Sequence, residues 1–274
     1  MRQFLIFVFS LFLSLNLFSQ ELEPANSSSD FIWYNDFSDS NDWIIEHDAT
    51  QCSLDWEIGE GLTAGGAYPI NTIQSSTYEN GCAMVDSDEY GGSEGGSEIE
   101  DSWITYEQPI DLSVYENLIL QFETFYRSWN YEKCWVVLSD DNTMWPELTP
   151  DSQEDPSNGI YEVFPGISGN GGTSLQQNPT LIELNISEYA AGKDEVYVRF
   201  HWTGTWGYTW FVDDVAIREQ SSNDVALTEI NLFPIGTFTN YGRVPQAFMD
   251  DLGQDGNVSV VVKNQGYNDA NYNL

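Results

Sequence analysis

Basic residues are scarce in this chain, and their scarcity limits what it can bind. The 274 residues include 8 Lys and Arg against 44 Asp and Glu, which gives a formal net charge of −36 at pH 7. Nucleic acids and anionic membrane surfaces are bound through clusters of basic side chains, so the composition argues against both partners. The excess of carboxylates favours divalent cations instead.

The residues and motifs of common catalytic sites are also missing. Only two histidines are present, His47 and His201, and neither has an evident partner in the sequence. No HExxH, P-loop or CxxC motif occurs. The stretch 91–95 matches G-x-S-x-G, but a nucleophile elbow needs a strand before it and a helix after it. Here Ser93 lies in an acidic, low-complexity loop, so we expect no hydrolase activity from it.

Cysteine is rare as well. Cys52, Cys82 and Cys134 are an odd number, so at least one thiol stays unpaired, and the pairing is open. We favour a Cys52–Cys82 disulfide because both residues lie in the loop-rich first half. The alternative is three buried, unpaired thiols.

A long apolar run occurs only at the N-terminus. Residues 1–20 carry one basic residue, Arg2, followed by the apolar stretch 4–18. This stretch is shorter than a typical membrane span and fits a secretory signal peptide cleaved near Ser19 or Gln20. The alternative is an uncleaved anchor helix. We predict a secreted or cell-surface protein whose mature chain does not insert into a membrane.

Helical periodicity is absent from the rest of the chain. Short apolar runs separated by Gly, Pro, Asn and Asp predict an all-β sandwich. The aromatic content of 15% is too high for a disordered chain. The expected strands are 32–37, 43–46, 82–85, 102–106, 117–126, 133–139, 160–164, 180–185, 195–203 and 209–218.

Changes in composition divide the chain. We expect a polar lead-in at 21–30, a sandwich at 31–218 and a linker at 219–224. Two further strand patterns, at 225–230 and 257–266, are typical of the start of an immunoglobulin-like sandwich in 225–274. This last part is too short to complete such a module, so we expect the sequence to be a fragment of a longer protein.

The strand pattern at 206–217 includes two adjacent carboxylates, Asp213 and Asp214. If Phe211, Val215 and Ile217 face a core, strand alternation places Asp213 on the same face. An ionised carboxylate is rarely buried unless it is paired or binds a metal. The segment therefore predicts a cation ligand. The alternative is an edge strand with two solvated aspartates, because the intervening positions are apolar too.

Several blocks of the sequence, in this order, resemble MAM-like jelly-roll domains, in particular the cleaved-adhesin and "choice-of-anchor" modules of secreted bacterial proteins. The resemblance covers about residues 31–218, and a weaker one links the tail to CARDB-type immunoglobulin-like modules. The blocks are 35–38 with Trp43, then 55–57, 83–91, 101–104, 109–113, 118–122, 184–190, 196–200 and 211–215.

The resemblance implies a concanavalin-like jelly-roll β-sandwich with structural calcium. It also implies surface display, adhesion or glycan binding, and often a role beside a protease or another enzyme. The chain departs from the usual pattern at 101–109, where the family commonly has a shorter loop. That departure puts the local loop in doubt but not the fold.

Closely spaced aspartates suggest where calcium would bind. Asp86, Asp88 and Gly91 match the first half of an EF-hand loop, although Tyr90 and Ser97 occupy positions that normally hold ligands. We expect a jelly-roll calcium loop rather than an EF-hand, and the alternative is a solvated acidic loop. The predicted ligands are Asp36, Asp86, Asp88, Asp213 and Asp214.

Two groups of aromatic residues could form a sugar-binding face. Aromatic rings flanked by polar groups stack on the apolar C–H faces of sugars. One group is Tyr126, Trp129 and Tyr131, and the other is Trp202, Trp206, Tyr208 and Trp210. Core packing is the alternative for each of them. We predict that the ligand-binding residues are Trp129, Tyr131, Trp206 and Tyr208.

These observations predict a non-catalytic adhesion or carbohydrate-binding module with structural calcium. Its partner would be a glycan or protein ligand on a surface, together with further domains of the same polypeptide. The alternative is an accessory domain of a larger secreted peptidase or glycoside hydrolase. A weaker third hypothesis is that the jelly roll is itself a hydrolase.

Overall fold

The fold is described from a computed structural model. The structure describes residues 31–91, 99–175, 177–223, 225–233, 257–264 and 266–268. The predicted signal peptide, the lead-in and Ser93 lie outside these residues.

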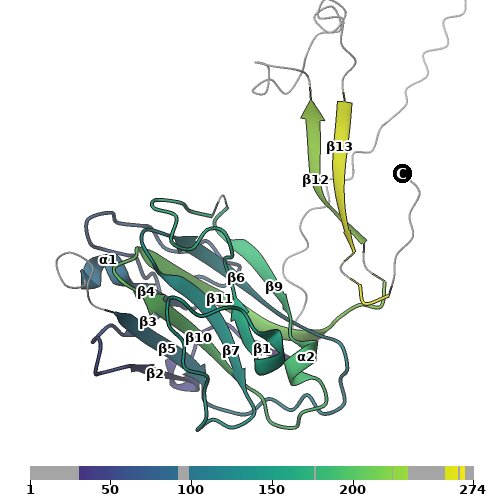
Figure 1. The fold of residues 1–274 in the computed structure, drawn as a ribbon, viewed down its shortest axis with the longest axis horizontal. Coiled ribbons are helices and arrows are strands. Elements are labelled where there is room, and N and C mark those ends of the chain that lie inside the picture. The colour runs from purple at the N-terminus through teal and green to yellow at the C-terminus, as the bar shows by residue number, and fades with distance from the viewer. Residues whose placement is uncertain are drawn as a thin grey trace, which may run out of the picture.

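Two antiparallel sheets form the sandwich (Figure 1), which confirms the predicted all-β jelly-roll class. In the first sheet the order is β3-β4-β11-β6-β9, and β1 also pairs with β11. In the second sheet the order is β2-β5-β10-β7-β8. The first sheet comprises β1 (Trp33–Asn35), β3 (Trp56–Gly59), β4 (Cys82–Asp86), β6 (Leu118–Arg127), β9 (Thr180–Asn185) and β11 (Thr209–Glu219). The second comprises β2 (Trp43–His47), β5 (Glu100–Tyr106), β7 (Lys133–Ser139), β8 (Ile160–Glu162) and β10 (Tyr197–Gly204).

The expected strands all occur, with ends that differ from the prediction by at most two residues. Strand β3 was not predicted. The short helices α1 (Ser87–Tyr90) and α2 (Ser187–Ala190), and the 3-10 turns η1 (Ser40–Asp42) and η2 (Pro156–Asn158), were not predicted either. Elements of three or four residues are too short to show a periodic pattern.

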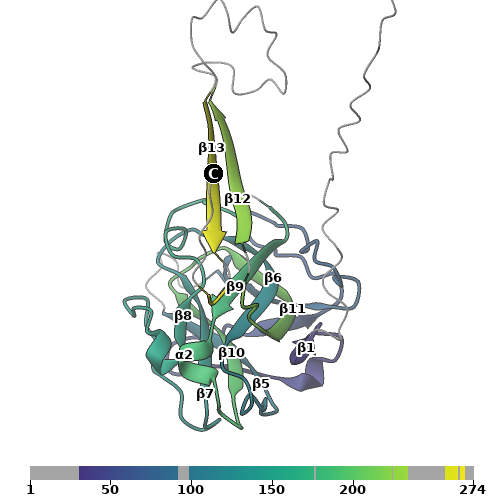
Figure 2. The same cartoon turned by 90° about the vertical axis from the view of Figure 1, so that its right-hand side faces the viewer.

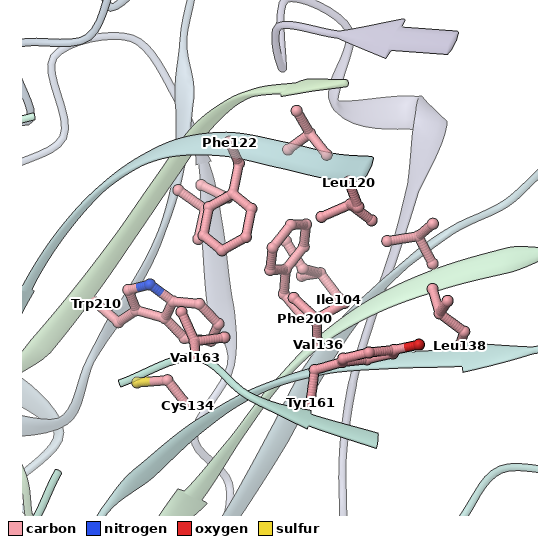
Figure 3. Close-up of a cluster of buried hydrophobic side chains, with 14 of the residues drawn as sticks. Ile104, Leu120, Phe122, Cys134, Val136, Leu138, Tyr161, Val163, Phe200 and Trp210 are labelled. Atoms are coloured by element: carbon pink, nitrogen blue, oxygen red, sulfur yellow. The ribbon is translucent and has the colours of Figure 1, made fainter. Parts of the chain in front are cut away.

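Aromatic side chains from both sheets meet in the core between them (Figure 3). Phe122 and Trp210 reach inward from the first sheet and meet Phe200 of the second, with ring centroids 5.1 and 5.8 Å from that of Phe200. Trp202 also projects inward and is fully buried. Burying one large apolar side chain stabilises a fold by about 1.5–3 kcal/mol, so these rings explain why the two sheets stay together.

A second, smaller core lies on the outer face of the first sheet. Residues 60–80, here called the covering segment, pack against that face. Ile73 of the segment is buried with Met84 of β4 and Phe211 of β11. The covering segment therefore buries one end of a sheet face that would otherwise be exposed.

The preferred Cys52–Cys82 disulfide is wrong. All three cysteines are free and buried. Cys52 belongs to the core between the sheets, whereas Cys82 belongs to the outer core under the covering segment. The first sheet separates the two thiols, and burial raises the pKa of Cys82 to about 12.

Strand β11 contains a bulge that the sequence pattern did not reveal. Asp213 is opposite Glu123 of β6, but Ala216 is opposite Gln121, so β11 has one extra residue at this point. Asp214 has a φ of 50°, in the left-handed region. Bulges of this kind bend a strand and redirect its side chains.

The bulge corrects the predicted face of Asp213. Before it, Phe211 and Asp213 point to the outer face of the sheet, as alternation requires. After it, Val215 and Ile217 face the core between the sheets. Asp213 therefore does not share a face with Val215 and Ile217. It is fully buried all the same.

Beyond the sandwich, β12 (Val225–Phe233) and β13 (Asn257–Asn264) form an antiparallel pair. Figures 1 and 2 show this pair apart from the two sheets. The immunoglobulin-like module at 225–274 stays a prediction. Among the described residues, no helix is long and apolar enough to cross a membrane.

Candidate ligand-binding surface

Three aromatic rings and one arginine gather at one end of the sandwich. Tyr208 is at the centre, with its ring centroid 5.3 Å from that of Tyr68 and 5.4 Å from that of Trp129. The guanidinium carbon of Arg127 lies 4.5 Å from the Tyr208 centroid and 5.9 Å from that of Tyr68. We call Tyr68, Arg127, Trp129 and Tyr208 the aromatic patch.

The patch has a buried base and exposed edges. Tyr208 is 3% exposed, whereas Tyr68 is 53% and Trp129 is 41% exposed. A cation over an aromatic face contributes about 0.5–2 kcal/mol, so Arg127 helps to fix the position of the Tyr208 ring. Tyr68 and Trp129 are therefore exposed to solvent while both contact the buried Tyr208 ring.

Strand pairing explains why these residues meet. Arg127 ends β6 and is opposite Thr209, the first residue of β11. The loop after β6 and the loop before β11 therefore leave the sheet side by side. Trp129 comes from the first loop, Tyr208 from the second, and Tyr68 from the covering segment. Loops that a rigid scaffold brings together are common places for binding residues.

Buried Glu132 holds the Trp129 loop in place. Its carboxylate accepts the backbone N–H groups of Trp129 at 2.5 Å and Asn130 at 2.6 Å, and the Tyr126 hydroxyl at 3.1 Å. The Asn130 amide then donates to the carbonyl oxygen of Thr205 at 3.0 Å. These hydrogen bonds tie the two loops together.

A second buried carboxyl, Glu100, supports the loop before β11. Glu100 accepts from the Trp202 indole and from the Ser87 hydroxyl, each at 2.8 Å. Ser87 in turn accepts the backbone N–H of Gly207 at 2.6 Å. Burial raises the pKa of Glu100 to about 7. This network fixes the backbone that carries Tyr208.

The carboxylates around α1 position Tyr68. Asp86, Glu89 and Asp88 accept the backbone N–H groups of residues 65, 66 and 68, at 2.6, 2.6 and 2.7 Å. Asp86 also caps α1 by accepting the N–H of Glu89 at 3.0 Å. The predicted metal ligands Asp86 and Asp88 thus hold one end of the covering segment.

Acidic residues at the bulge hold the other end of that segment. Asp213, Asp214 and Glu123, here called the bulge cluster, accept hydrogen bonds from the three consecutive residues at 75–77. Asp213 accepts the Ser75 hydroxyl at 2.5 Å, Asp214 that of Thr77 at 2.9 Å, and Glu123 the backbone N–H of residue 76 at 2.6 Å.

The carboxyls of the bulge cluster affect one another. Burial, and then the charge of Asp214, raise the pKa of Asp213 to about 8. The pKa of Glu123 is also raised, first by burial and further by the Asp214 carboxyl in contact with it. Carboxylates this close repel one another unless a proton or a cation lies between them.

The five predicted metal ligands do not form one set. Asp86 is opposite Thr209, four residues before Asp213, and at about 3.3 Å per residue the two are roughly 13 Å apart along β11. Asp36 follows the β1 residue opposite Val215 and so lies beside Asp214. It accepts from Ser38 and, at 3.2 Å, from the Asn80 amide. Among the described residues, no group of three or more His, Cys, Asp or Glu could hold a metal ion.

The structure separates the predicted aromatic residues into three kinds. Tyr126, Trp202 and Trp210 are core residues. Trp129 is exposed, as is Tyr131 of the same loop at 71%. Trp206 is half-buried with a φ of 51°, and Tyr208, expected at the surface, is the buried base of the patch.

Tyr68 and Arg127 were missed by the sequence analysis. Tyr68 lies 61 positions before Trp129 in a segment without strand alternation, so no local pattern links the two. The scarcity of Lys and Arg was the one signal in the sequence that could have pointed to Arg127. Of the five Lys and Arg residues in the sandwich, Lys133, Lys193 and Arg218 pair with carboxylates at 3.2, 2.8 and 2.6 Å. The other two, Arg127 and Arg199, lie over aromatic rings instead.

Comparison with known proteins identifies no family. No family model and no curated protein sequence matches the chain. Among solved structures, the K1 cleaved adhesin domain of Lys-gingipain (Kgp) from Porphyromonas gingivalis W83 is 18% identical. The match covers 69% of this chain and 98% of that domain, with a TM-score of 0.37. The K3 domain of the same protein is 14% identical, with 68% and 98% covered and a TM-score of 0.37.

A family 11 carbohydrate-binding module from Clostridium thermocellum, in complex with a β-1,3-1,4-mixed-linked tetrasaccharide, is 9% identical. That match covers 68% of this chain and 93% of the module, with a TM-score of 0.34. The identities are low and the three TM-scores are below 0.5, so these matches carry no argument about function.

Proposed function

We propose that the chain is a carbohydrate-binding or adhesion module that binds a glycan at the aromatic patch. The observation that carries this proposal is that two exposed rings, Tyr68 and Trp129, rest on one buried base. Sugar rings stack on aromatic faces through their apolar C–H groups. A preorganised surface loses little side-chain freedom on binding, so even a small patch can bind.

Arg127 adds polar recognition to this stacking surface. Its Nε is buried and has no hydrogen-bond partner among the described residues. Guanidinium groups have five N–H donors in a fixed geometry, which suits the hydroxyl oxygens of a sugar. Export of the chain and membership of the cleaved-adhesin type belong to the same proposal, because a glycan-binding module acts outside the cell.

Replacing the exposed rings tests the proposal. A Tyr68→Ala/Trp129→Ala variant of the full chain should bind its best ligand on a glycan array roughly 30-fold more weakly, since a buried aromatic anchor contributes about 2 kcal/mol. Its melting temperature should not change. Tyr267→Ala, which removes an exposed ring outside the sandwich, is the matched control. Equal affinity of both variants for every array ligand would rule out the patch.

We also propose that the bulge cluster, together with Asp36, binds calcium. The donors are all oxygen atoms, which calcium prefers, and it accepts six to eight of them in flexible geometries. Burial and, after it, the charge of Asp214 raise the pKa values of Asp213 and Glu123, and a divalent cation would neutralise the repulsive part of this effect. As placed in the structure, these described carboxylates do not form a metal site. In this proposal the side chains of Asp36, Asp213 and Asp214 turn to hold the ion with Glu123. Asp86 and Asp88 do not take part, because Asp86 lies opposite Thr209, roughly 13 Å from Asp213 along β11.

A further inference from the structure

A separate pocket lies on the outer face of the second sheet. Its volume is about 570 Å³, within the usual range of about 300–1,000 Å³ for small-molecule sites. Trp103 of β5 and Arg199 and His201 of β10 line it from the sheet, while Trp145 and Glu147 line it from the loop after β7. We call this cavity the sheet pocket, and none of its residues belongs to the aromatic patch.

Strand alternation explains the pocket's lining. On β10, Val198, Phe200 and Trp202 face the core, so Arg199 and His201 face outward. Asp101 and Trp103 of β5 face outward for the same reason, and the pairing of Trp103 with His201 brings them together. His201 was judged from the sequence to have no evident partner, and this face was not predicted.

Arg199 is the central cation of the pocket. It is only 6% exposed, and its guanidinium carbon lies 4.8 Å from the Trp103 centroid and 3.8 Å from that of Trp145. Its Nε donates to the Thr105 hydroxyl at 2.9 Å. No carboxylate in the described part of the chain forms an ion pair with it. Its terminal N–H groups are thus left to donate to a ligand.

Asp101 supplies an acceptor beside these donors, and buried His201 fixes its position. His201 Nε2 lies 2.5 Å from an Asp101 carboxylate oxygen, so this nitrogen carries the proton that Asp101 accepts. Nδ1 is then an acceptor, and it is buried without a partner among the described residues. Burial lowers the pKa of His201, which keeps the ring neutral at pH 7 and preserves this arrangement.

The chemistry of the lining indicates the ligand. Two indole rings suit the apolar faces of a pyranose, and adjacent donors and acceptors suit its vicinal hydroxyls. Asp48, Asp101 and Glu147 also line the pocket. Their negative charge, on a chain of net charge −36, disfavours a carboxylated or sulfated sugar.

We propose that the sheet pocket is a second sugar-binding site that takes a neutral pyranose residue. The proposal extends the proposed function to another surface and depends on different side chains. Two sites on one chain would bind a polysaccharide bivalently, and linked binding can strengthen overall attachment by about 10²–10⁴-fold without any new contact.

The test uses the full chain and five neutral trisaccharides, of glucose in α-1,4 and β-1,4 linkage, mannose, galactose and xylose. Trigalacturonate and 3′-sialyllactose are the acidic probes. Binding is measured by calorimetry in the Tyr68→Ala/Trp129→Ala background, which lacks both exposed rings of the patch. We expect residual binding of at least one neutral trisaccharide, weakened at least 10-fold by adding Trp145→Ala.

A second variant protects the result against loss of fold. Trp145 packs beside Leu148 and Ile160, and Trp145→Leu keeps an apolar side chain there while removing the ring. It should weaken binding as Trp145→Ala does, with an unchanged melting temperature. The proposal is overturned if residual binding is unaffected by both variants, is confined to the acidic probes, or is absent while the wild type binds. The last result would leave the aromatic patch as the binding site. If the wild type binds none of the neutral probes, this proposal fails whichever site is considered.

Discussion

At the residue scale, most carboxyl groups in the described part of the chain serve as hydrogen-bond acceptors within the fold. Several exposed aspartates accept from the residue two positions later, which lowers their pKa through hydrogen bonds. This is the Asx-turn arrangement, in which an Asp side chain closes its own turn. The aspartates concerned are Asp39, Asp48, Asp111, Asp141 and Asp155. The acidic composition therefore reflects turn chemistry as well as partner choice.

Two buried carboxyls should make the protein less stable as the pH rises. The pKa of Glu100 is raised to about 7 and that of Asp213 to about 8. Both groups bind a proton more tightly when folded than when unfolded, so the free energy of unfolding falls as the pH increases from about 4 to 8. Thermal melts of the chelated protein across this range should show the trend.

Variants separate these carboxyls from the general repulsion among acidic groups. Asp213→Asn should flatten the pH dependence between pH 4 and 8, whereas Glu107→Gln, which changes an exposed carboxyl, should leave its slope almost intact. Parallel slopes for wild type and Asp213→Asn would show that Asp213 does not titrate in this range.

At the element scale, local patterns predicted the strands but not what covers them. In runs such as 133–139 and 180–185, apolar residues alternate or cluster between turn signals. The first and last residues of both strands were predicted correctly. The bulge in β11 was missed because the residues around it are apolar on both faces of the strand. A shift in the alternation of inward and outward positions therefore does not change the apolar pattern of the sequence. The covering segment was missed because its partners, such as Asp213 for Ser75, are 138 positions away.

Glycines in the covering segment test whether its attachment to α1 matters. Gly61 and Gly66 both have positive φ, but a Cβ at Gly61 would meet open space, whereas one at Gly66 would lie 2.5 Å from the backbone carbon of Asp88. Gly61→Ala should lower the melting temperature by roughly 2–8 °C, from about 1–2 kcal/mol of backbone strain. Gly66→Ala should lower it at least twice as much.

Hydrogen exchange gives the second measurement on these variants. Faster exchange at residues 65–70 in Gly66→Ala, but not in Gly61→Ala, would show that the segment has detached from α1 and that Tyr68 has lost its support. Equal effects of the two substitutions would mean that close packing against Asp88 is not what holds the segment.

At the scale of the whole molecule, the fold class was predictable but the sites were only partly so. Trp129 and Tyr131 were predicted as ligand-binding residues because they lie in a polar loop at a strand end, and both are exposed in the structure. Tyr68 and the sheet pocket depend on contacts between distant segments, which one sequence does not reveal. Trp206 and Tyr208 were chosen for glycine spacing, but that spacing serves a tight loop: a Cβ at Gly207 would lie 2.6 Å from the Trp202 ring.

Calcium should act on the stability of the whole sandwich. A ligand that binds only the folded state stabilises it by about 4 kcal/mol at 1,000-fold excess over its dissociation constant. Melting temperature should therefore fall on chelation and recover with calcium, and calcium should abolish the loss of stability toward pH 8. Asp214→Asn should remove the response, while Asp88→Asn should retain it. An unchanged melting temperature in chelator, with no metal found by elemental analysis, would refute the calcium proposal.

The most direct test of the central claim is a crystal structure of the full chain bound to the oligosaccharide that ranks first on the array. The account predicts a sugar ring stacked on Trp129 or Tyr68, within hydrogen-bonding reach of Arg127. A structure in which the oligosaccharide is well ordered elsewhere, while both rings stay exposed to solvent, would contradict it.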